Sequence, residues 1–178
     1  MAALKIIIQI IGVLLLFLLV WLGITRYKMP DVSAGKPAPD IVSVNPNGDT
    51  LRLSDLRGNW VLLDFWGSWC GPCRESNKKI VALYKDYLNA EFKDAKGFTV
   101  FSVGIENKRE NWIRAIQHDG LIWPYHVSSL DKFNDTAAKT YGIREIPATI
   151  LISPKGNIMG VNLDIKLINA QLSKSLKK

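Results

Sequence analysis

The sequence has few of the residues on which most enzyme active sites depend. Its 178 residues include only two cysteines and two histidines. Gly-rich phosphate loops, the HExxH pattern and Ser-centred nucleophile motifs do not occur, which argues against nucleotide-dependent transferases, zinc proteases and serine hydrolases. Internal repeats and low-complexity tracts are also lacking. The roughly 150 residues that follow the apolar N-terminus suffice for one domain with its own core.

A strong excess of charge is missing as well. The net charge of +7 is moderate, and the basic residues are scattered rather than clustered. This pattern does not favour nucleic-acid binding and is typical of solvated helix faces with some attraction to anionic lipid headgroups. His118 and His126 have no recognisable metal-ligand spacing and are interpreted as ordinary loop residues. No metal or other cofactor is predicted.

The N-terminus, in contrast, contains one long uncharged stretch. From Ile6 to Thr25 no residue is charged, and only Gln9 and Thr25 are plainly polar. Twenty such residues reach about 30 Å as a helix, which is enough to cross the hydrocarbon core of a bilayer. We therefore predict a transmembrane anchor over residues 1–28, with Trp21 near the membrane interface.

The anchor is predicted to remain uncleaved. The stretch is long for a signal peptide, and residues 24–29 contain no small-x-small cleavage site. Tyr27 would then lie at the interface with Trp21. Basic residues flank both ends, Lys5 on one side and Arg26 on the other, so the positive-inside rule does not orient the helix.

The two cysteines lie three residues apart in the segment Trp-Cys-Gly-Pro-Cys, residues 69–73. The preceding residues 60–66 form a branched and aromatic run that predicts a buried strand. Downstream, Pro72 suits the first turn of a helix, and apolar residues then recur at helical spacing. The pattern therefore places Cys70 at a helix N-terminus.

This position gives the cysteine pair its expected chemistry. Free N–H groups and the helix dipole stabilise a thiolate at Cys70, which predicts that Cys70 is the nucleophile. Cys73 faces the same side one turn further on, and it can release a captured substrate by closing a disulfide with Cys70. A structural disulfide would close too short a loop to add much stability, and a zinc knuckle needs four ligands. Dithiol-disulfide exchange is the favoured interpretation.

Helices alternate with strands after the anchor. Residues 29–38 contain two charged residues and two prolines, which predicts a linker into a domain over residues 39–178. An Asn-Gly turn at 47–48 predicts a hairpin of residues 41–44 and 50–53. The other expected elements are strands at 60–66, 98–105, 147–152 and 158–163, and helices after Cys70 and at 109–119, 132–141 and 164–176. This order predicts an α/β fold with a mixed sheet flanked by helices on both faces.

Residues 64–74, Asp-Phe-Trp-Gly-Ser-Trp-Cys-Gly-Pro-Cys-Arg, resemble the active-site segment of the thioredoxin superfamily. Within it the chain resembles the membrane-anchored TlpA/ResA-like thiol-disulfide oxidoreductases, also over residues 35–40, 51–58 and 141–149. The N-terminal hairpin resembles that of AhpC/TSA-type peroxiredoxins. The resemblance implies a thioredoxin-like fold with an N-terminal β-hairpin and a segment inserted around residues 106–130.

The resemblance also implies a role for Asp64, six residues before Cys70. Thioredoxins keep a buried carboxylate at this spacing, beneath the resolving cysteine, and it relays that cysteine's proton. An inward Asp64 would have a pKa raised by desolvation and could exchange a proton with Cys73 near neutral pH. Taken without the resemblance, Asp64 could instead turn outward at a strand edge, because a buried charge is costly.

The substrate-binding surface is likewise assigned by resemblance. In the family, the proline that matches Pro147 is cis and faces the cysteines, so that the backbone of Ile146 pairs with the extended chain of the substrate. Trp66 and Trp69 would rim this surface, although core packing competes with that role, above all for Trp66. The residues expected to contact substrate are Trp69, Gly71, Pro72, Ile146 and Pro147.

One part of the chain departs from the family pattern. Several relatives carry a glutamate three residues after the second cysteine and a proline shortly beyond it, where this chain has Ser76 and Lys78. We therefore expect a helix without a proline kink. Asp64 is therefore expected to act as the acid-base group.

The function implied is that of a membrane-anchored thiol-disulfide oxidoreductase acting on protein disulfides, with its catalytic domain facing the periplasm or the cell exterior. The Gly-Pro pair between the cysteines resembles thioredoxin, near about −270 mV, rather than the strong oxidants near about −120 mV, and so favours a reductase. A reductase there needs a transmembrane electron donor. Cytochrome c maturation and general extracytoplasmic thiol redox are the processes implied, and a chain without stray thiols suits an oxidising compartment.

Two alternative functions stay open at the level of sequence. A thiol peroxidase is suggested by the hairpin, but residues 67–69 do not supply the Thr-x-x-Cys context of a peroxidatic cysteine. A copper-binding assembly factor would use Cys70, Cys73 and a histidine such as His126 as ligands.

Overall fold

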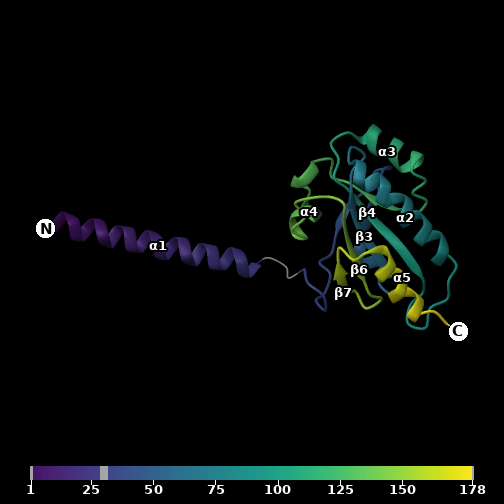
Figure 1. The fold of residues 1–178 in the computed structure, drawn as a ribbon. Coiled ribbons are helices and arrows are strands. Elements are labelled where there is room, and N and C mark those ends of the chain that lie inside the picture. Colours follow the sequence, from purple (N-terminus) through teal and green to yellow (C-terminus); the bar gives the residue numbers. More distant parts are fainter. Residues whose placement is uncertain (1, 29–31, 178) are drawn as a thin grey trace. The chain divides into compact units, whose positions relative to one another are not determined.

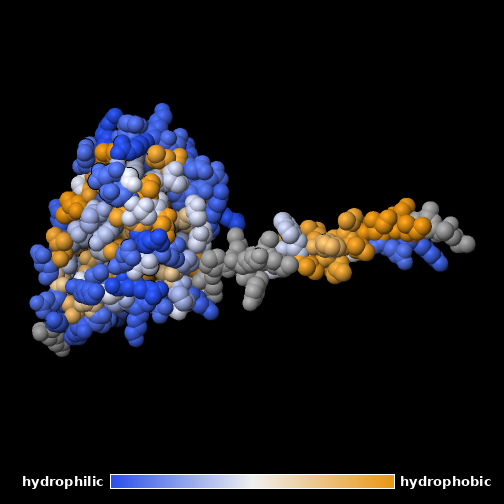
Figure 2. Space-filling model, turned by 180° about the vertical axis from the view of Figure 1, so that it is seen from behind, coloured by the Kyte–Doolittle hydropathy of each residue, from blue (hydrophilic) through white to orange (hydrophobic). Residues whose placement is uncertain are grey.

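The computed structural model describes residues 2–28 and 32–177. The N-terminal unit is a single helix, α1 (Ala2–Lys28; Figure 1). Its segment Lys5–Gly23 is long and apolar enough to cross a membrane, and its apolar side chains form the continuous hydrophobic surface seen in Figure 2. The expected N-terminal helix is thus present as a candidate membrane span.

The folded domain begins at Val32, which is earlier than the sequence predicts. The backbone N–H of Gly35 donates to the carbonyl of Ile158 at 2.8 Å, so this segment already pairs with the C-terminal half of the domain. The predicted linker over residues 29–38 is therefore corrected, because its second part belongs to the domain. Residues 29–31 lie outside the described residues.

A five-stranded mixed sheet forms the centre of the domain (Figure 1). Its strands are β3 (Trp60–Trp66), β4 (Phe98–Gly104), β5 (Tyr125–Val127), β6 (Ala148–Ile152) and β7 (Ile158–Val161). The order across the sheet is β5-β4-β3-β6-β7, with β3, β4 and β5 parallel and β6 and β7 each antiparallel to its neighbours. Every residue of β3 and β4 is buried, which explains their nearly continuous apolar sequences.

Helices cover both faces of the sheet, as predicted. On one face lie α2 (Gly71–Tyr87), α3 (Arg109–His118) and α5 (Ile165–Lys174), whose buried side chains share one core cluster. On the other face, α4 (Thr136–Thr140) and the 3-10 helix η1 (Leu53–Leu56) pack into a second cluster. The helix α2 is continuous over 17 residues, in line with the lack of an internal proline.

The predicted N-terminal hairpin is present as a separate two-stranded sheet, β1 (Val42–Val44) and β2 (Thr50–Arg52). The Asn45 side chain accepts the backbone N–H of Asp49 at 2.9 Å and so closes the turn. Gly48 has a φ of +92°, a conformation that side chains other than glycine rarely adopt.

Two predicted segments differ from the structure. Residues 132–141 form a short 3-10 helix, η2 (Lys132–Asn134), followed by α4 instead of one helix. Asp135 separates them because its side chain caps α4, accepting the N–H of Ala137 at 2.7 Å. The segment around residues 106–130 adds the edge strand β5 as well as α3, and a three-residue strand is too short to leave a periodic signal.

Candidate active site

Cys70 and Cys73 form a disulfide at the start of α2, with an S–S distance of 2.04 Å. Cys70 is the N-cap residue, and its sulfur accepts the backbone N–H of Cys73 at 3.1 Å. Cys70 keeps 6% of its surface exposed, whereas Cys73 has none. Of the two sulfur-bearing side chains, only Cys70 is therefore accessible from solvent.

The loop that precedes β6 lies against the disulfide. The sulfur of Cys70 is 3.7 Å from the carbonyl oxygen of Ile146, and the Ile146–Pro147 peptide bond is cis, as the resemblance implied. Gly71, Pro72 and Pro147 are exposed, and Ile146 is half-buried. The structure thus gathers these predicted substrate-contact residues around Cys70.

The two tryptophans near the cysteines have different environments. Trp66 is fully buried in the core, so of its two expected roles core packing is confirmed and a place at the rim is not. Trp69 is 52% exposed, and its Nε1–H donates to the carbonyl of Ile105 at 2.8 Å. A Cβ atom on Gly67 would lie 2.8 Å from this ring nitrogen, so the position requires glycine. The exposed tryptophan borders the site in a fixed orientation.

Asp64 is completely buried in the central strand β3 and is not turned outward at an edge. The residues two before and two after it, Leu62 and Trp66, pack in the same core cluster as Cys73. Burial raises the pKa of Asp64 to about 7, and a hydrogen bond from Ser102 opposes part of that rise. A carboxyl group with this pKa can exchange a proton near neutral pH.

A short series of hydrogen bonds connects Asp64 to the neighbouring strand. Ser102 lies opposite Asp64 in β4 and donates its Oγ–H to Oδ2 at 3.3 Å, while it accepts the Nε1–H of Trp123 at 3.0 Å. The other carboxyl oxygen, Oδ1, has no hydrogen-bond partner among the residues that the structure describes. The single hydroxyl proton of Ser102 therefore favours the ionised carboxylate.

Ser102→Ala is expected to raise the pKa of Asp64 further, because the buried carboxylate loses its one donor. A smaller ionised fraction at pH 7 would slow resolution of the mixed disulfide by about fivefold. The measurement is the pH dependence of that step in the full-length protein in neutral detergent, where the midpoint should move to higher pH. Ser102→Thr keeps the hydroxyl and should leave the midpoint in place. An unchanged midpoint in Ser102→Ala would contradict this role.

Glu106 is a buried acid that the sequence analysis did not single out. Its carboxylate accepts the backbone N–H of Ser68 and, at 3.0 Å, the Ser68 hydroxyl. Burial raises the pKa of Glu106, and these hydrogen bonds oppose the rise. The contact holds the loop before Cys70 against the end of β4. The sequence did contain a signal for this contact. Glu106 follows one buried strand and Ser68 follows another, and the carboxyl ends of parallel strands meet at one edge of a sheet.

Arg74 connects the start of α2 to the end of α3. Its guanidinium donates to both carboxylate oxygens of Asp119, one of them at 2.5 Å, and to the carbonyl of Ser68 at 3.3 Å. Asn77 donates to the same carboxylate at 2.9 Å. Burial alone would raise the pKa of Asp119, but hydrogen bonds from Arg74, Asn77 and His118 lower it. This bidentate pair orients the helix turn that carries the disulfide.

The histidines do not complete a metal site with the cysteines. His126 is buried in β5, and its Nε2 is 3.2 Å from the carbonyl oxygen of Leu121, which corrects its expected place in a loop. Burial lowers the pKa of His126 to about 4. Within residues 2–28 and 32–177, no three His, Cys, Asp or Glu side chains gather to hold a metal ion. The ligand set considered for copper is therefore not assembled.

Comparison with known proteins places this site in a family. The AhpC/TSA family profile matches residues 34–161. The thiol-disulfide oxidoreductase ResA of Geobacillus thermodenitrificans is 31% identical over 151 residues, which cover 82% of this chain and 81% of that protein. ResA of Bacillus subtilis is 28% identical over 153 residues, covering 83% and 80%.

A solved structure shows the same arrangement of the domain. The thiol-disulfide oxidoreductase from Bacteroides fragilis is 30% identical and superposes with a TM-score of 0.69, covering 78% of this chain and 98% of that one. The fold is thus thioredoxin-like, and the matched residues include the Cys70–Cys73 disulfide. By its sequence, its fold and the place of its cysteines, the chain belongs to the AhpC/TSA family and is a thioredoxin-like thiol-disulfide oxidoreductase.

Proposed function

We propose that this oxidoreductase is anchored to the cytoplasmic membrane by α1 and reduces protein disulfides outside the cytoplasm. The observation that carries the proposal is the position of the disulfide. Cys70 caps a helix N-terminus beside the half-buried Ile146 and the exposed Pro147, while Cys73 is buried behind it. An extended polypeptide can therefore reach one sulfur and not the other.

The geometry supports a two-step exchange. The Cys70 thiolate attacks one sulfur of a substrate disulfide, and the other substrate sulfur leaves as a thiolate and takes up a proton. During this step the backbone of Ile146 aligns the substrate chain. Cys73 then gives its proton to Asp64 and attacks the Cys70 sulfur, which releases the second substrate thiolate. The substrate gains two electrons, and the protein ends with the Cys70–Cys73 disulfide.

Reduction is favoured over oxidation by the residues between the cysteines. Gly71 and Pro72 are the pair found in thioredoxin, whose potential is near about −270 mV. Such a protein must be reduced again after each turnover. We infer a transmembrane electron donor for this step, because an oxidising compartment offers no pool of strong reductant.

The proposed location outside the cytoplasm is supported by the candidate membrane helix and by the likeness to ResA proteins. Apocytochrome c cysteines and mispaired cysteines of secreted proteins are the substrates that fit this location. Protease treatment of intact spheroplasts tests the orientation. Digestion of the domain would support the proposal, and protection until the membrane is opened would overturn it.

The reduction potential of the Cys70–Cys73 pair tests the direction of electron flow. Full-length protein in neutral detergent is equilibrated with glutathione or dithiothreitol buffers, and its free thiols are alkylated and counted by mass spectrometry. We expect a value near about −270 mV, below the glutathione couple. A value near about −120 mV would instead make the protein a disulfide donor. Cys73→Ser is the control, because it can form only mixed disulfides.

A further inference from the structure

A basic pocket lies beside the active-site loop. It is open to solvent and has a volume of about 370 Å³. Its lining includes Ser68, Trp69 and Arg74 from the loop and α2, and Asn111, Arg114 and His118 from α3. All the titratable side chains in this lining are bases. The pocket therefore differs from the apolar surroundings of the disulfide, although Trp69 borders both.

The face of α3 that lines the pocket presents an unpaired cation. Asn111, Arg114 and His118 are three or four residues apart and so project from one side of the helix. All three are exposed. In the described part of the chain, no hydrogen bond or ion pair holds the Arg114 guanidinium, whereas the guanidinium of Arg74 is bound to Asp119. Arg114 is thus available to a ligand.

The nearby acids leave the charge of Arg114 unpaired. Glu110, one turn before Arg114 on α3, is exposed and forms no ion pair with it within the described residues. The Asp119 side chain is only 8% exposed and is bound by Arg74. Glu106 is 1% exposed and is bound by Ser68. Asp119 offsets the charge of Arg74, so Arg114 supplies the unpaired positive charge that faces solvent in the pocket and attracts anions there.

We propose that this pocket binds a carboxylate side chain of the substrate polypeptide, an aspartate or glutamate close in sequence to the cysteine that Cys70 attacks. The inference rests on the proposed action on protein disulfides. A chain captured at Cys70 passes Trp69, and an extended chain advances about 3.3 Å per residue, so a few residues span the distance to the pocket. On the Trp69 ring, the Lys132 ammonium lies 5.9 Å from the ring centroid and adds a second positive charge.

The test compares two synthetic peptides with the same internal disulfide, one with glutamates beside a cysteine and one with glutamines there. Reduction by the pre-reduced full-length protein in neutral detergent is followed at low and high salt. We expect kcat/KM to be about fivefold higher for the glutamate peptide through a lower KM, and the difference to shrink at high salt. In Arg114→Gln most of the preference should be lost, because only Lys132 remains beside Trp69, while Arg114→Lys should keep most of it.

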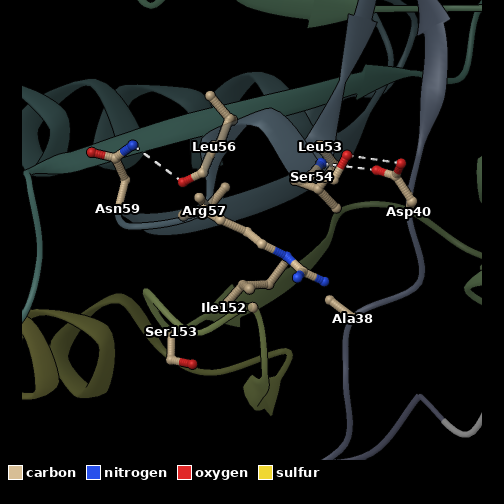
Figure 3. Close-up of a pocket in the computed structure, with 11 residues that line it drawn as sticks. Ala38, Asp40, Leu53, Ser54, Leu56, Arg57, Asn59, Ile152 and Ser153 are labelled. Carbon is tan, nitrogen blue, oxygen red and sulfur yellow. Dashed lines mark hydrogen bonds between the residues drawn. The ribbon is translucent and has the colours of Figure 1, made fainter.

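Arg57→Gln is the matched control. Arg57 is also exposed, but it lies just before the start of β3, at the end opposite Cys70, and extends across a separate pocket of about 90 Å³ near Asp40 and Ser54 (Figure 3). This variant removes the same charge and should keep the peptide preference. A preference that is missing from the unmodified protein, or that persists in Arg114→Gln, would overturn the inference.

Failure of the proposed function gives a different result. If neither peptide is reduced, the direction of the reaction is wrong, and the same preference is then measured for oxidation of the two dithiol peptides by the disulfide form. If the glutamine peptide reacts and the glutamate peptide gains nothing, only the pocket assignment fails. Anionic lipid vesicles provide a further comparison. If they inhibit peptide reduction by the unmodified protein but not by Arg114→Gln, and no preference for the glutamate peptide is seen, the pocket binds lipid headgroups and the inference is overturned.

Discussion

Cys70→Ser is expected to abolish disulfide exchange, with a loss of about a thousandfold or more, because a serine hydroxyl is not ionised at neutral pH and cannot form a disulfide with the substrate. Cys73→Ser should have a different effect. It leaves the partly exposed Cys70 sulfur able to attack but removes the buried sulfur that resolves the product. Mixed disulfides with substrate should therefore accumulate in Cys73→Ser and be missing from Cys70→Ser.

The two variants are compared on non-reducing gels after incubation of the full-length protein in detergent with a disulfide-containing protein. Mass spectrometry of the trapped species identifies the cysteine that is joined to substrate. Trapping by Cys70→Ser instead would reverse the assignment of the attacking and resolving cysteines. Trapping by neither variant would mean that the pair does not exchange disulfides with polypeptides.

Asp64→Asn is expected to stabilise the protein at alkaline pH. The pKa of Asp64 is about 7 in the folded chain, against an ordinary value of 3.8, so between these values the native state binds more protons than the unfolded state. Stability therefore falls as the pH rises from about 4 to about 7, by about 4 kcal/mol if the whole shift is realised. An asparagine cannot ionise. Its free energy of unfolding should match that of the unmodified protein near pH 4 and exceed it by up to that amount at pH 8.

The same variant should be slow in catalysis although it is more stable. Without a carboxylate to accept the Cys73 proton, the mixed disulfide should resolve more slowly at pH 7, and the difference should narrow at high pH, where solvent hydroxide deprotonates the thiol. Stability is measured by urea unfolding followed by tryptophan fluorescence, and resolution by stopped-flow. A variant that is less stable than the parent at pH 8 would contradict the desolvation argument.

Asp119→Asn provides a control of opposite sign. Hydrogen bonds from Arg74, Asn77 and His118 lower the pKa of Asp119 despite its burial, so the ionised carboxylate contributes stability above its ordinary pKa. That contribution is lost as the pH falls through the lowered value. Asp119→Asn should therefore be less stable than the parent at neutral pH, and the free energies of unfolding of the two proteins should become equal in acid. Together, the two substitutions test whether burial and hydrogen bonding determine if an Asp→Asn change raises or lowers the free energy of unfolding.

The parts of this protein that could be predicted from sequence are those in which a few neighbouring residues determine the outcome. The 20 uncharged residues from Ile6 to Thr25 are sufficient for a membrane-crossing helix. The strand at 60–66, the proline in the first helix turn and the spacing of Cys70 and Cys73 locate the disulfide, because each depends on contacts within one or two turns of chain. The Asn-Gly turn predicts the hairpin in the same way.

Assignments that depend on distant residues were obtained only with the resemblance or were missed. The inward position of Asp64 and the cis Ile146–Pro147 bond had to be inferred from the family. The strand around Asp64 is almost continuously apolar and so has no alternation from which its surroundings could be predicted. A bond that precedes proline is usually trans, so the sequence alone does not predict the cis form. The strand β5 was missed, and the location of His126 in a loop was predicted incorrectly. Each of these depends on what packs against the residue and not on its neighbours in sequence.

The sequence by itself thus determined the apolar N-terminal helix, the order of most elements and the position of the cysteine pair. The tertiary structure decided the environment of that pair. It brings Ser102 to Asp64, Glu106 to Ser68 and Asp119 to Arg74, contacts that join residues 38 to 45 positions apart. Such contacts depend on the order of strands in the sheet and on the exclusion of water from its core, and a local pattern of residues encodes neither.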